Sequence, residues 1–318
     1  MSLFEKPTKK SAGLKILAYG FEGTGKTLFA LSAPDIVLID TEAGSAFYLG
    51  RKEGENVKGV LRTQGYKKYE DALSEVARDW DKLGMQTLVT DSVTKIRQNL
   101  SDTIINVDVK RNKRNGMADA ELNSNLSMRS WGKIGEISKR HQNIKIDLSN
   151  NVNIVDIAQA KEIKDDNQQV IDIRPDMDKS APYDYDLKLY LFTKKDSDGT
   201  MKFYARVDKD RTKKYKTGDI IENPSFELWS STLSDSDNRV ETSYSDDQKQ
   251  DEKAYTEEVE KDNQTIQERL AEFSGNLSAE DKKKFTELLS ENKITNLNKM
   301  TKAQHKKLIG LMDNFNKA

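Results

Sequence analysis

The feature that most constrains this chain is a glycine-rich octapeptide near its start. Residues 20–27 read Gly-Phe-Glu-Gly-Thr-Gly-Lys-Thr, which fits the pattern G-x-x-x-x-G-K-[ST]. The apolar run 14–19 before it predicts a buried strand, and the apolar run 28–31 after it predicts the start of a helix. A strand, such a loop and a helix in this order are typical of a phosphate-binding loop (P-loop).

Each part of the octapeptide has a predicted role. The glycines allow the backbone to wrap closely and to direct N–H groups at phosphate oxygens. Lys26 is predicted to reach the β- and γ-phosphates, the Thr27 hydroxyl to bind Mg²⁺, and the helix N-terminus to add the positive end of its dipole. The predicted nucleotide-binding residues are Gly20, Phe21, Glu22, Gly23, Thr24, Gly25, Lys26 and Thr27.

Composition limits the classes of partner and compartment. The net charge is −1, so any contact with nucleic acid must come from a local patch. The chain has no cysteine, which excludes disulfides and thiolate metal sites and suits a reducing cytoplasm. The first 12 residues show no secretory signal, and no apolar run approaches the length of a membrane span. We therefore expect a cytoplasmic protein without a membrane partner.

The chain divides into four predicted parts. Residues 1–12 are predicted to be a flexible leader. In residues 13–230, short apolar runs alternate with amphipathic stretches, which indicates βαβ units and an α/β core with a mostly parallel sheet. The expected strands are Lys15–Tyr19, Ile36–Asp40, Gln86–Asp91, Asn153–Ala158 and Leu187–Thr193, followed by a hairpin of Tyr190–Lys194 and Met201–Val207 with its turn at 197–199.

Composition changes after the core. Residues 231–263 are predicted to be a flexible acidic linker, because residues 235–262 hold eleven acids and four bases (11 − 4, net −7). Apolar periodicity returns in residues 264–318, which predicts a small C-terminal helical module. Ser278 with Asp281 and Thr301 with Gln304 look like helix N-termini in this module.

Acidic residues at two strand ends form a second layer of the nucleotide site. Asp91 ends the strand 86–91, which we expect next to the P-loop strand, and such an acid holds Mg²⁺ opposite the P-loop threonine. Glu42 follows the strand 36–40 at the end that faces ligands in open α/β sheets. It is either the general base for the water that attacks the γ-phosphate or a solvated loop carboxylate.

Three of these features resemble the ATPase core of RecA-type recombinases and their relatives. They are the D-x-E of residues 40–42, the Asp-Ser-Val of residues 91–93, and Gln159 at the end of the strand 153–158. The resemblance implies a RecA-like P-loop NTPase core that binds ATP and Mg²⁺. It also implies that Glu42 activates the attacking water and that Gln159 senses the γ-phosphate beside a DNA-binding loop.

A fourth feature is the K-x-R of Lys209 and Arg211, just after a strand. RecA-like helicases and related ATPases use such a pair as fingers that reach the ATP of a neighbouring subunit and neutralise charge in the transition state. The resemblance therefore implies catalytic roles for Asp91, Glu42, Gln159, Lys209 and Arg211. It also implies a homo-oligomer, either a ring or a filament.

More narrowly, residues 13–229 resemble phage-encoded, single-domain RecA-like ATPases of the AAA type, some of which are single-strand annealing recombinases. That resemblance implies an ATPase stimulated by DNA, acting in phage recombination, annealing or repair in the cytoplasm of an infected bacterium. Single-stranded DNA is the expected partner, and the helical module is a candidate contact for DNA or a single-strand DNA-binding protein.

A short basic run is the candidate DNA contact. Residues 109–116 contain Lys110, Arg111, Lys113 and Arg114, which we expect in a loop after the helix that follows Asp91. The run either contacts phosphates or is a solvated charged loop. An amphipathic helix is expected from residue 128, with Trp131 in the core and His141 at the surface.

Three other functions remain open from the sequence. The protein could be an assembly or DNA-binding module driven by ATP binding, with incidental hydrolysis. It could be a ring helicase or loader, which the K-x-R pair fits equally well. A P-loop small-molecule kinase needs a lid rich in arginine, and the stretch before Asp91 offers only Arg51, Arg62 and Arg78.

Overall fold

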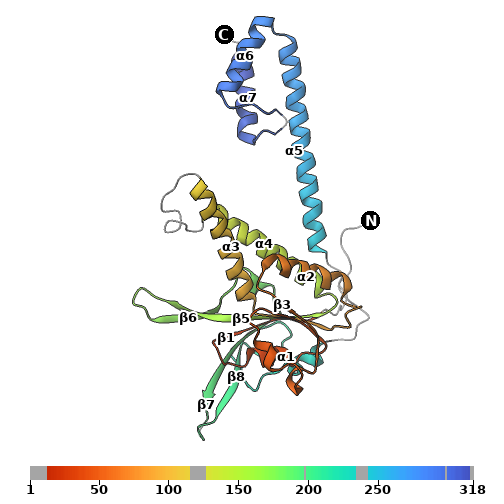
Figure 1. Cartoon of the computed structure of the whole chain (residues 1–318), viewed down its shortest axis with the longest axis vertical. Helices are drawn as coiled ribbons and strands as arrows, with labels where there is room; N and C mark the ends of the chain where they lie inside the picture. Colours follow the sequence, from red (N-terminus) through yellow and green to blue (C-terminus); the bar gives the residue numbers. More distant parts are fainter. Residues whose placement is uncertain (1–12, 115–126, 197, 234–242, 298, 316–318) are drawn as a thin grey trace. The chain divides into compact units, whose positions relative to one another are not determined.

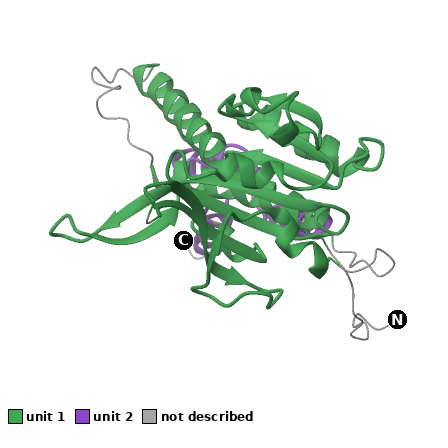
Figure 2. Cartoon of the chain, turned by 90° about the horizontal axis from the view of Figure 1, so that it is seen from below, with its two compact units in different colours: residues 1–245 green, residues 246–318 purple. Residues whose placement is uncertain are grey.

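The computed structural model describes residues 13–114, 127–196, 198–233, 243–297 and 299–315. The expected leader, residues 1–12, lies outside this part. The chain forms two compact units, residues 1–245 and 246–318, which Figure 2 draws in different colours.

The larger unit is built on a nine-stranded sheet in the order β3-β2-β4-β5-β1-β7-β8-β9, with β6 paired to β5 (Figure 1). All neighbours from β3 to β7 are parallel, so the expected α/β core with a mostly parallel sheet is confirmed. The strands are β1 (Lys15–Gly20), β2 (Ile36–Asp40), β3 (Val57–Arg62), β4 (Thr87–Asp91), β5 (Asn153–Lys164), β6 (Val170–Pro175), β7 (Leu187–Lys195), β8 (Met201–Asp210) and β9 (Ile220–Glu222).

Helices cover both faces of the sheet, which explains why the central strands are nearly continuous apolar runs. On one face, Phe29 and Trp229 pack against Ile16 and other core residues. On the opposite face, Leu73 packs in a cluster with Ile154. The helices of this unit are α1 (Lys26–Leu31), α2 (Tyr66–Asp79), α3 (Val93–Arg114) and α4 (Met128–Leu148), with short 3₁₀ segments η1 (Gly44–Phe47), η2 (Lys52–Gly54), η3 (Ala181–Tyr183) and η4 (Phe226–Thr232).

The position of β4 differs from the expected one. We expected Asp91 on a strand next to the P-loop strand β1, but β5 lies between β1 and β4. The chain returns from α4 into this space, so the strand that ends at Asp91 is one place further out. The number of residues between the P-loop and Asp91 cannot predict this, because β5 comes later in the chain than Asp91 and is inserted between β1 and β4.

The expected hairpin is confirmed as β7 and β8, which are antiparallel and both longer than predicted. The Asp196 N–H donates to the Thr200 carbonyl at 2.9 Å across the turn, and Ser197 lies outside the described residues. A row of stacked rings, Tyr190, Phe192 and Tyr204, lies along one side of this hairpin.

The C-terminal part is helical, as expected. Its helices are α5 (Tyr244–Gly275), α6 (Ala279–Glu291) and α7 (Lys302–Phe315). Ile266, Phe285 and Leu308 are buried in their common core. Ser278 is the N-cap of α6 and accepts a hydrogen bond from the Asp281 N–H at 3.1 Å, as the sequence predicts.

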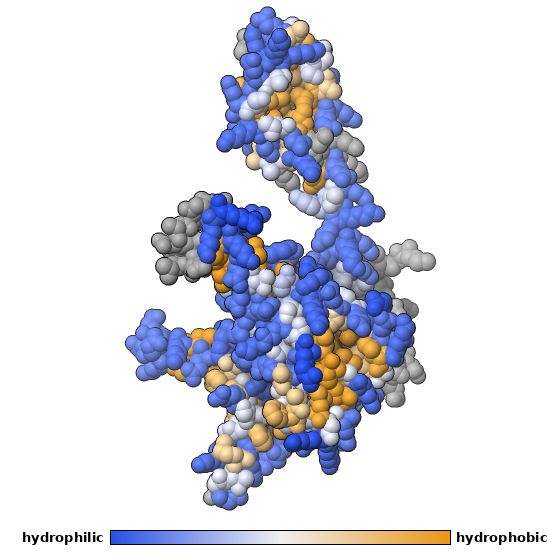
Figure 3. Space-filling view, in the orientation of Figure 1, coloured by the Kyte–Doolittle hydropathy of each residue, from blue (hydrophilic) through white to orange (hydrophobic). Residues whose placement is uncertain are grey.

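The prediction of a flexible acidic linker is wrong for residues 244–263, because this stretch belongs to the helix α5. Lys249 pairs with Asp246 at 2.8 Å and Lys253 with Glu257 at 3.9 Å, at the spacings that support a helix. The first part of α5 is exposed, and Figure 3 shows it as hydrophilic, so its composition alone resembles a linker. Residues 234–242 lie outside the described part.

Candidate nucleotide site

A cleft of about 720 Å³ opens at the carboxyl end of β1. Its wall is the whole octapeptide together with residues from α1, from the strands β4 and β5, and from the segment that follows β2. The lining residues are Gly20, Phe21, Glu22, Gly23, Thr24, Gly25, Lys26, Thr27, Leu28, Glu42, Tyr48, Asp91, Gln159 and Ala160. All eight predicted nucleotide-binding residues are therefore brought together. Tyr48 is an addition that no motif marked, because it follows the 3₁₀ segment η1.

Two glycines explain why the octapeptide can form this wall. A Cβ at Gly20 would overlap the Leu191 carbonyl oxygen, so β1 and β7 approach too closely there for any side chain. Gly25 has φ +83°, and a Cβ there would also lie 3.0 Å from the Phe203 ring. The backbone turns in this way directly into α1, whose N-terminus faces the cleft.

Lys26, Thr27 and Asp91 form the charged centre of the cleft. The Thr27 hydroxyl donates to Asp91 Oδ2 at 2.6 Å, and the Lys26 ammonium donates to the Phe21 carbonyl. Burial raises the pKa of Asp91 to about 6, although the Thr27 hydrogen bond opposes this. Burial also lowers the pKa of Lys26. A hydroxyl and a carboxylate side by side are hard oxygen donors, and this donor set fits Mg²⁺.

Glu42 is held over the same cleft by two donors. Ser92 Oγ donates to Glu42 Oε1 at 2.7 Å, and Gln159 Nε2 donates to the same oxygen at 2.8 Å. Both bonds end on Oε1, so the orientation of the carboxylate is set from two different strands, by the residue after β4 and by a residue within β5. Glu42 is exposed, but these two hydrogen bonds orient its carboxylate in the cleft.

Strand register explains why residues so distant in sequence meet here. Gly20 is opposite Gln159, and Asp40 is opposite Asp91, which is itself opposite Ile157. The strands β1, β2 and β4 therefore end near one level of the sheet, and β5 passes this level and continues to Lys164. Buried Asp40 accepts the backbone N–H of Glu42 at 3.1 Å and of Ser45 at 3.2 Å, which shapes the turn that carries Glu42. In the D-x-E motif, Asp40 therefore shapes the turn, and Glu42 places its carboxylate in the cleft.

Comparison with known proteins agrees with this geometry. A sequence profile described as an AAA domain matches residues 12–218, well over half of the chain. The chain belongs to the AAA domain family. A KaiC-like protein from the hyperthermophilic archaeon Pyrococcus horikoshii OT3 has a similar structure, with 13% identity and a TM-score of 0.39, over 66% of this chain and 85% of that one. A search of curated proteins found no match.

The K-x-R pair lies far from the nucleotide cleft of its own AAA domain. Leu191 pairs with Gly20 at the cleft end of β1, whereas Asp210 pairs with Leu187 at the other end. The backbone N–H of Arg211 donates to the Asp186 carbonyl, and the backbone N–H of Asp186 donates to the Lys15 carbonyl. The pair is thus beside the first residue of β1, about 16 Å along the strand from Gly20.

The basic run of the AAA domain is not the expected loop. Lys110, Arg111, Lys113 and Arg114 belong to the last turns of α3, and residues 115 and 116 lie outside the described part. Arg111 pairs with Asp108 at 2.8 Å. A helix fits because positive side chains near a helix C-terminus interact favourably with the helix dipole.

Two expectations for α4 are reversed. Trp131 is 48% exposed and not a core residue, whereas His141 is only 6% exposed. Burial and the nearby Lys145 charge lower the pKa of His141 to about 4, so its ring is neutral. Among the described residues, His141 Nε2 has no hydrogen-bond partner.

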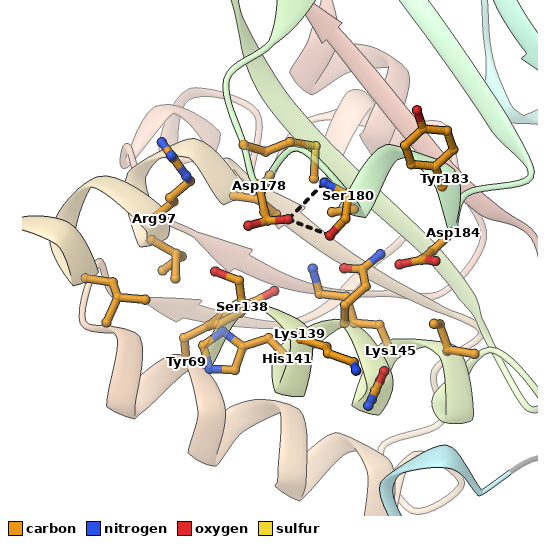
Figure 4. A pocket seen from close by; sticks show the side chains of 18 residues that line it. Tyr69, Arg97, Ser138, Lys139, His141, Lys145, Asp178, Ser180, Tyr183 and Asp184 are labelled. Atoms are coloured by element: carbon orange, nitrogen blue, oxygen red, sulfur yellow. Dashed lines mark hydrogen bonds between the residues drawn. The ribbon is translucent and has the colours of Figure 1, made fainter. Parts of the chain in front are cut away.

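His141 lines a second cavity of about 320 Å³, between α3, α4 and residues 177–184 (Figure 4). Beside it, the buried Lys145 ammonium pairs with Asp156 at 2.6 Å. Burial opposes the charge of Lys145, but Asp156 more than offsets this and the pKa of Lys145 is raised. No motif marks this pair, although an acid at position 156 inside the apolar run 154–158 is a signal that could have indicated a buried partner. No helix in the described residues is long and apolar enough to span a bilayer.

Proposed function

We propose that this protein is an ATPase that binds Mg-ATP in the cleft and hydrolyses it with Glu42 as the general base. The observation that carries the proposal is the double hydrogen bond from Ser92 and Gln159 to the Glu42 carboxylate, in the same cleft as Lys26 and Asp91. A general base must be oriented toward the proton that it takes, and these two donors supply that orientation.

The other residues of the cleft bind and neutralise. The octapeptide N–H groups and Lys26 would hold the phosphates, and Thr27 with Asp91 would hold Mg²⁺. The metal ion, when bound, neutralises charge that develops on the phosphate oxygens. Gln159 joins the base to β5, so it is suited to sense the γ-phosphate.

We further propose that each site is completed by a neighbouring subunit. Lys209 and Arg211 lie at the end of β1 that is opposite the P-loop, which prevents them from serving their own site. A homo-oligomer in a ring or a filament would bring them to the ATP of the next subunit. The resemblance to RecA-type proteins supports the same arrangement.

The biological role that we propose is phage DNA recombination, annealing or repair on single-stranded DNA. It rests on the resemblance to phage ATPases and on the four cations at the end of α3. The small helical module is a candidate contact for a single-strand DNA-binding protein, and the cytoplasm of an infected bacterium is the proposed location.

The test is ATP turnover at low salt, with and without single-stranded DNA, in the wild type, Lys26→Ala and Glu42→Gln. We expect turnover stimulated by DNA in the wild type and no ATP binding in Lys26→Ala. Glu42→Gln should bind ATP but lose at least about 100-fold in turnover, as expected for removal of a general base.

The same variants show which outcome would overturn the proposal. Full turnover in Glu42→Gln would remove Glu42 as the base. If strand annealing survives in Glu42→Gln while turnover is lost, ATP binding is the functional event and hydrolysis is incidental. ATP turnover that is the same with and without DNA would refute the recombination role. The protein would then be a nucleotide-binding protein of another pathway.

A further inference from the structure

The K-x-R pair is held by two acceptors of its own subunit. Lys209 Nζ donates to the Tyr183 carbonyl at 2.9 Å, and Arg211 Nη2 donates to the same carbonyl at 3.2 Å. Arg211 Nη1 donates to Asp186 Oδ1 at 3.3 Å. The guanidinium therefore meets one carbonyl, at the end of η3, and one carboxylate, from the residue before β7.

Asp186 is fixed more firmly than the residue that it holds. Asp186 Oδ2 accepts the Lys15 backbone N–H at 3.1 Å and the Lys15 ammonium at 2.9 Å. The side chain of Asp186 is 18% exposed, whereas that of Arg211 is 56% exposed. One carboxylate oxygen thus anchors Asp186 to β1, and the other points at an exposed arginine.

From this arrangement we propose that Asp186 is a positioning residue for Arg211. The proposal rests on the proposed function, in which Arg211 acts on the ATP of a neighbouring subunit. A free arginine side chain loses rotamer entropy when it is fixed. Asp186 and the Tyr183 carbonyl fix the guanidinium before the neighbour binds, so less of this entropy is lost during the reaction.

The contact orients Arg211 without trapping it. Ion pairs of exposed side chains contribute little to stability. A phosphate with several negative oxygens is a stronger acceptor for the guanidinium than a single carboxylate. Arg211 can therefore exchange partners when a nucleotide-bound neighbour arrives.

A purely structural role is the competing explanation, because Asp186 also holds Lys15 at the edge of β1. The two roles differ in which partner matters. If Asp186 only fixes the strand edge, removal of Lys15 should be as harmful as removal of the Asp186 charge. If Asp186 positions Arg211, turnover depends on the charge of Asp186 and not on Lys15.

The test measures ATP turnover in the full-length protein for Asp186→Asn, with Lys15→Met as the matched control. We expect kcat to fall about 10-fold in Asp186→Asn with KM for ATP unchanged, and to stay near the wild-type value in Lys15→Met. The double variant Lys15→Met/Asp186→Asn removes the half-buried Lys15 ammonium together with the carboxylate that pairs with it, so it should fold and show the same loss as Asp186→Asn.

Two further measurements separate positioning from damage to the fold. Asp186→Asn should add no further loss to Arg211→Ala, because both act through one group. Asp186→Asn mixed with Lys26→Ala should regain turnover, because a Lys26→Ala neighbour supplies intact fingers to the intact P-loop of Asp186→Asn. A misfolded subunit would not be rescued in this way.

The outcomes also separate this inference from the proposed function. Wild-type turnover in Asp186→Asn, together with a large loss in Arg211→Ala, overturns the positioning role and leaves the shared site intact. An equal loss in Lys15→Met points to a structural role and also overturns it. Wild-type turnover in Arg211→Ala overturns the shared site and, with it, the role of Asp186.

Discussion

At the scale of single residues, Asp91 links the nucleotide site to stability. Its usual pKa is 3.8, and burial raises it to about 6 in the folded protein. Between these values the folded state binds more protons than the unfolded chain does, so stability falls as the pH rises through this window. Above pH 6 the charged carboxylate destabilises the protein by at most about 3 kcal/mol.

Asp91→Asn should therefore be more stable than the wild type above pH 6, without nucleotide, and this advantage should disappear below pH 4. The amide can still accept the Thr27 hydrogen bond but carries no charge to desolvate. Thermal unfolding from pH 4 to 8 measures the difference, and Asp71→Asn, which changes an exposed acid on α2, is the control. A difference in Tm that does not vary with pH would contradict the burial effect.

The residue scale also shows what sequence can predict. The octapeptide, Asp91, Glu42 and Gln159 meet because neighbouring parallel strands bring them to nearly one level of the sheet, on the side where ligands bind in open α/β folds. His141 and Trp131 were assigned wrongly because both lie on one amphipathic helix, whose buried side depends on the neighbouring α2 and α3. Side-chain type alone does not decide that.

At the scale of elements, the end of α3 is the testable DNA contact. Lys110 and Arg114 are four residues apart on a helix, so they lie on the same face. Lys110→Ala/Arg114→Ala should weaken binding of single-stranded DNA and reduce the slope of log K against log salt by about 1.4, at about 0.7 for each phosphate contact. Lys52→Ala, at an exposed position in η2, is the control. An unchanged slope would remove α3 from the interface.

The cap of α6 is a second test at this scale. Ser278→Ala removes the side-chain acceptor for the Asp281 N–H, which should destabilise the C-terminal unit by about 1 kcal/mol. Thermal unfolding of the full-length protein followed by circular dichroism measures this loss. Ser274→Ala, within α5, is the matched control and should have a smaller effect. Equal effects would mean that the cap contributes little.

Element prediction succeeded where burial and helix period agree and failed where charge dominates. The predicted strands begin within one residue of the observed ones, because burial on both faces leaves a continuous apolar run. The more polar second half of β5 and the strands β3, β6 and β9 were not predicted. The basic end of α3 and the acidic start of α5 were predicted as loop and linker. Their helices depend on dipole and side-chain pairing, which composition does not reveal.

At the scale of the whole molecule, the two ends of β1 carry the two halves of one proposed site. Lys26→Ala retains Lys209 and Arg211 but does not bind nucleotide, whereas Arg211→Ala binds nucleotide but lacks the arginine finger. Each variant alone should be inactive, whereas an equal mixture should recover about a quarter of wild-type turnover, the share of composite sites among random neighbours. Mixtures of Lys26→Ala with wild type set the baseline, and no recovery would contradict a shared site.

Because the P-loop and the Lys209–Arg211 fingers lie at opposite ends of β1, the number of complete sites depends on the form of the assembly. Contacts that join opposite ends of a subunit are heterologous, so the assembly either closes into a ring or stays open. In a ring every nucleotide has a finger from a neighbour, whereas an open row always leaves one terminal nucleotide without one. Turnover per subunit in an open row therefore rises with its length and approaches a limit, while in a ring it takes one fixed value as soon as the ring closes.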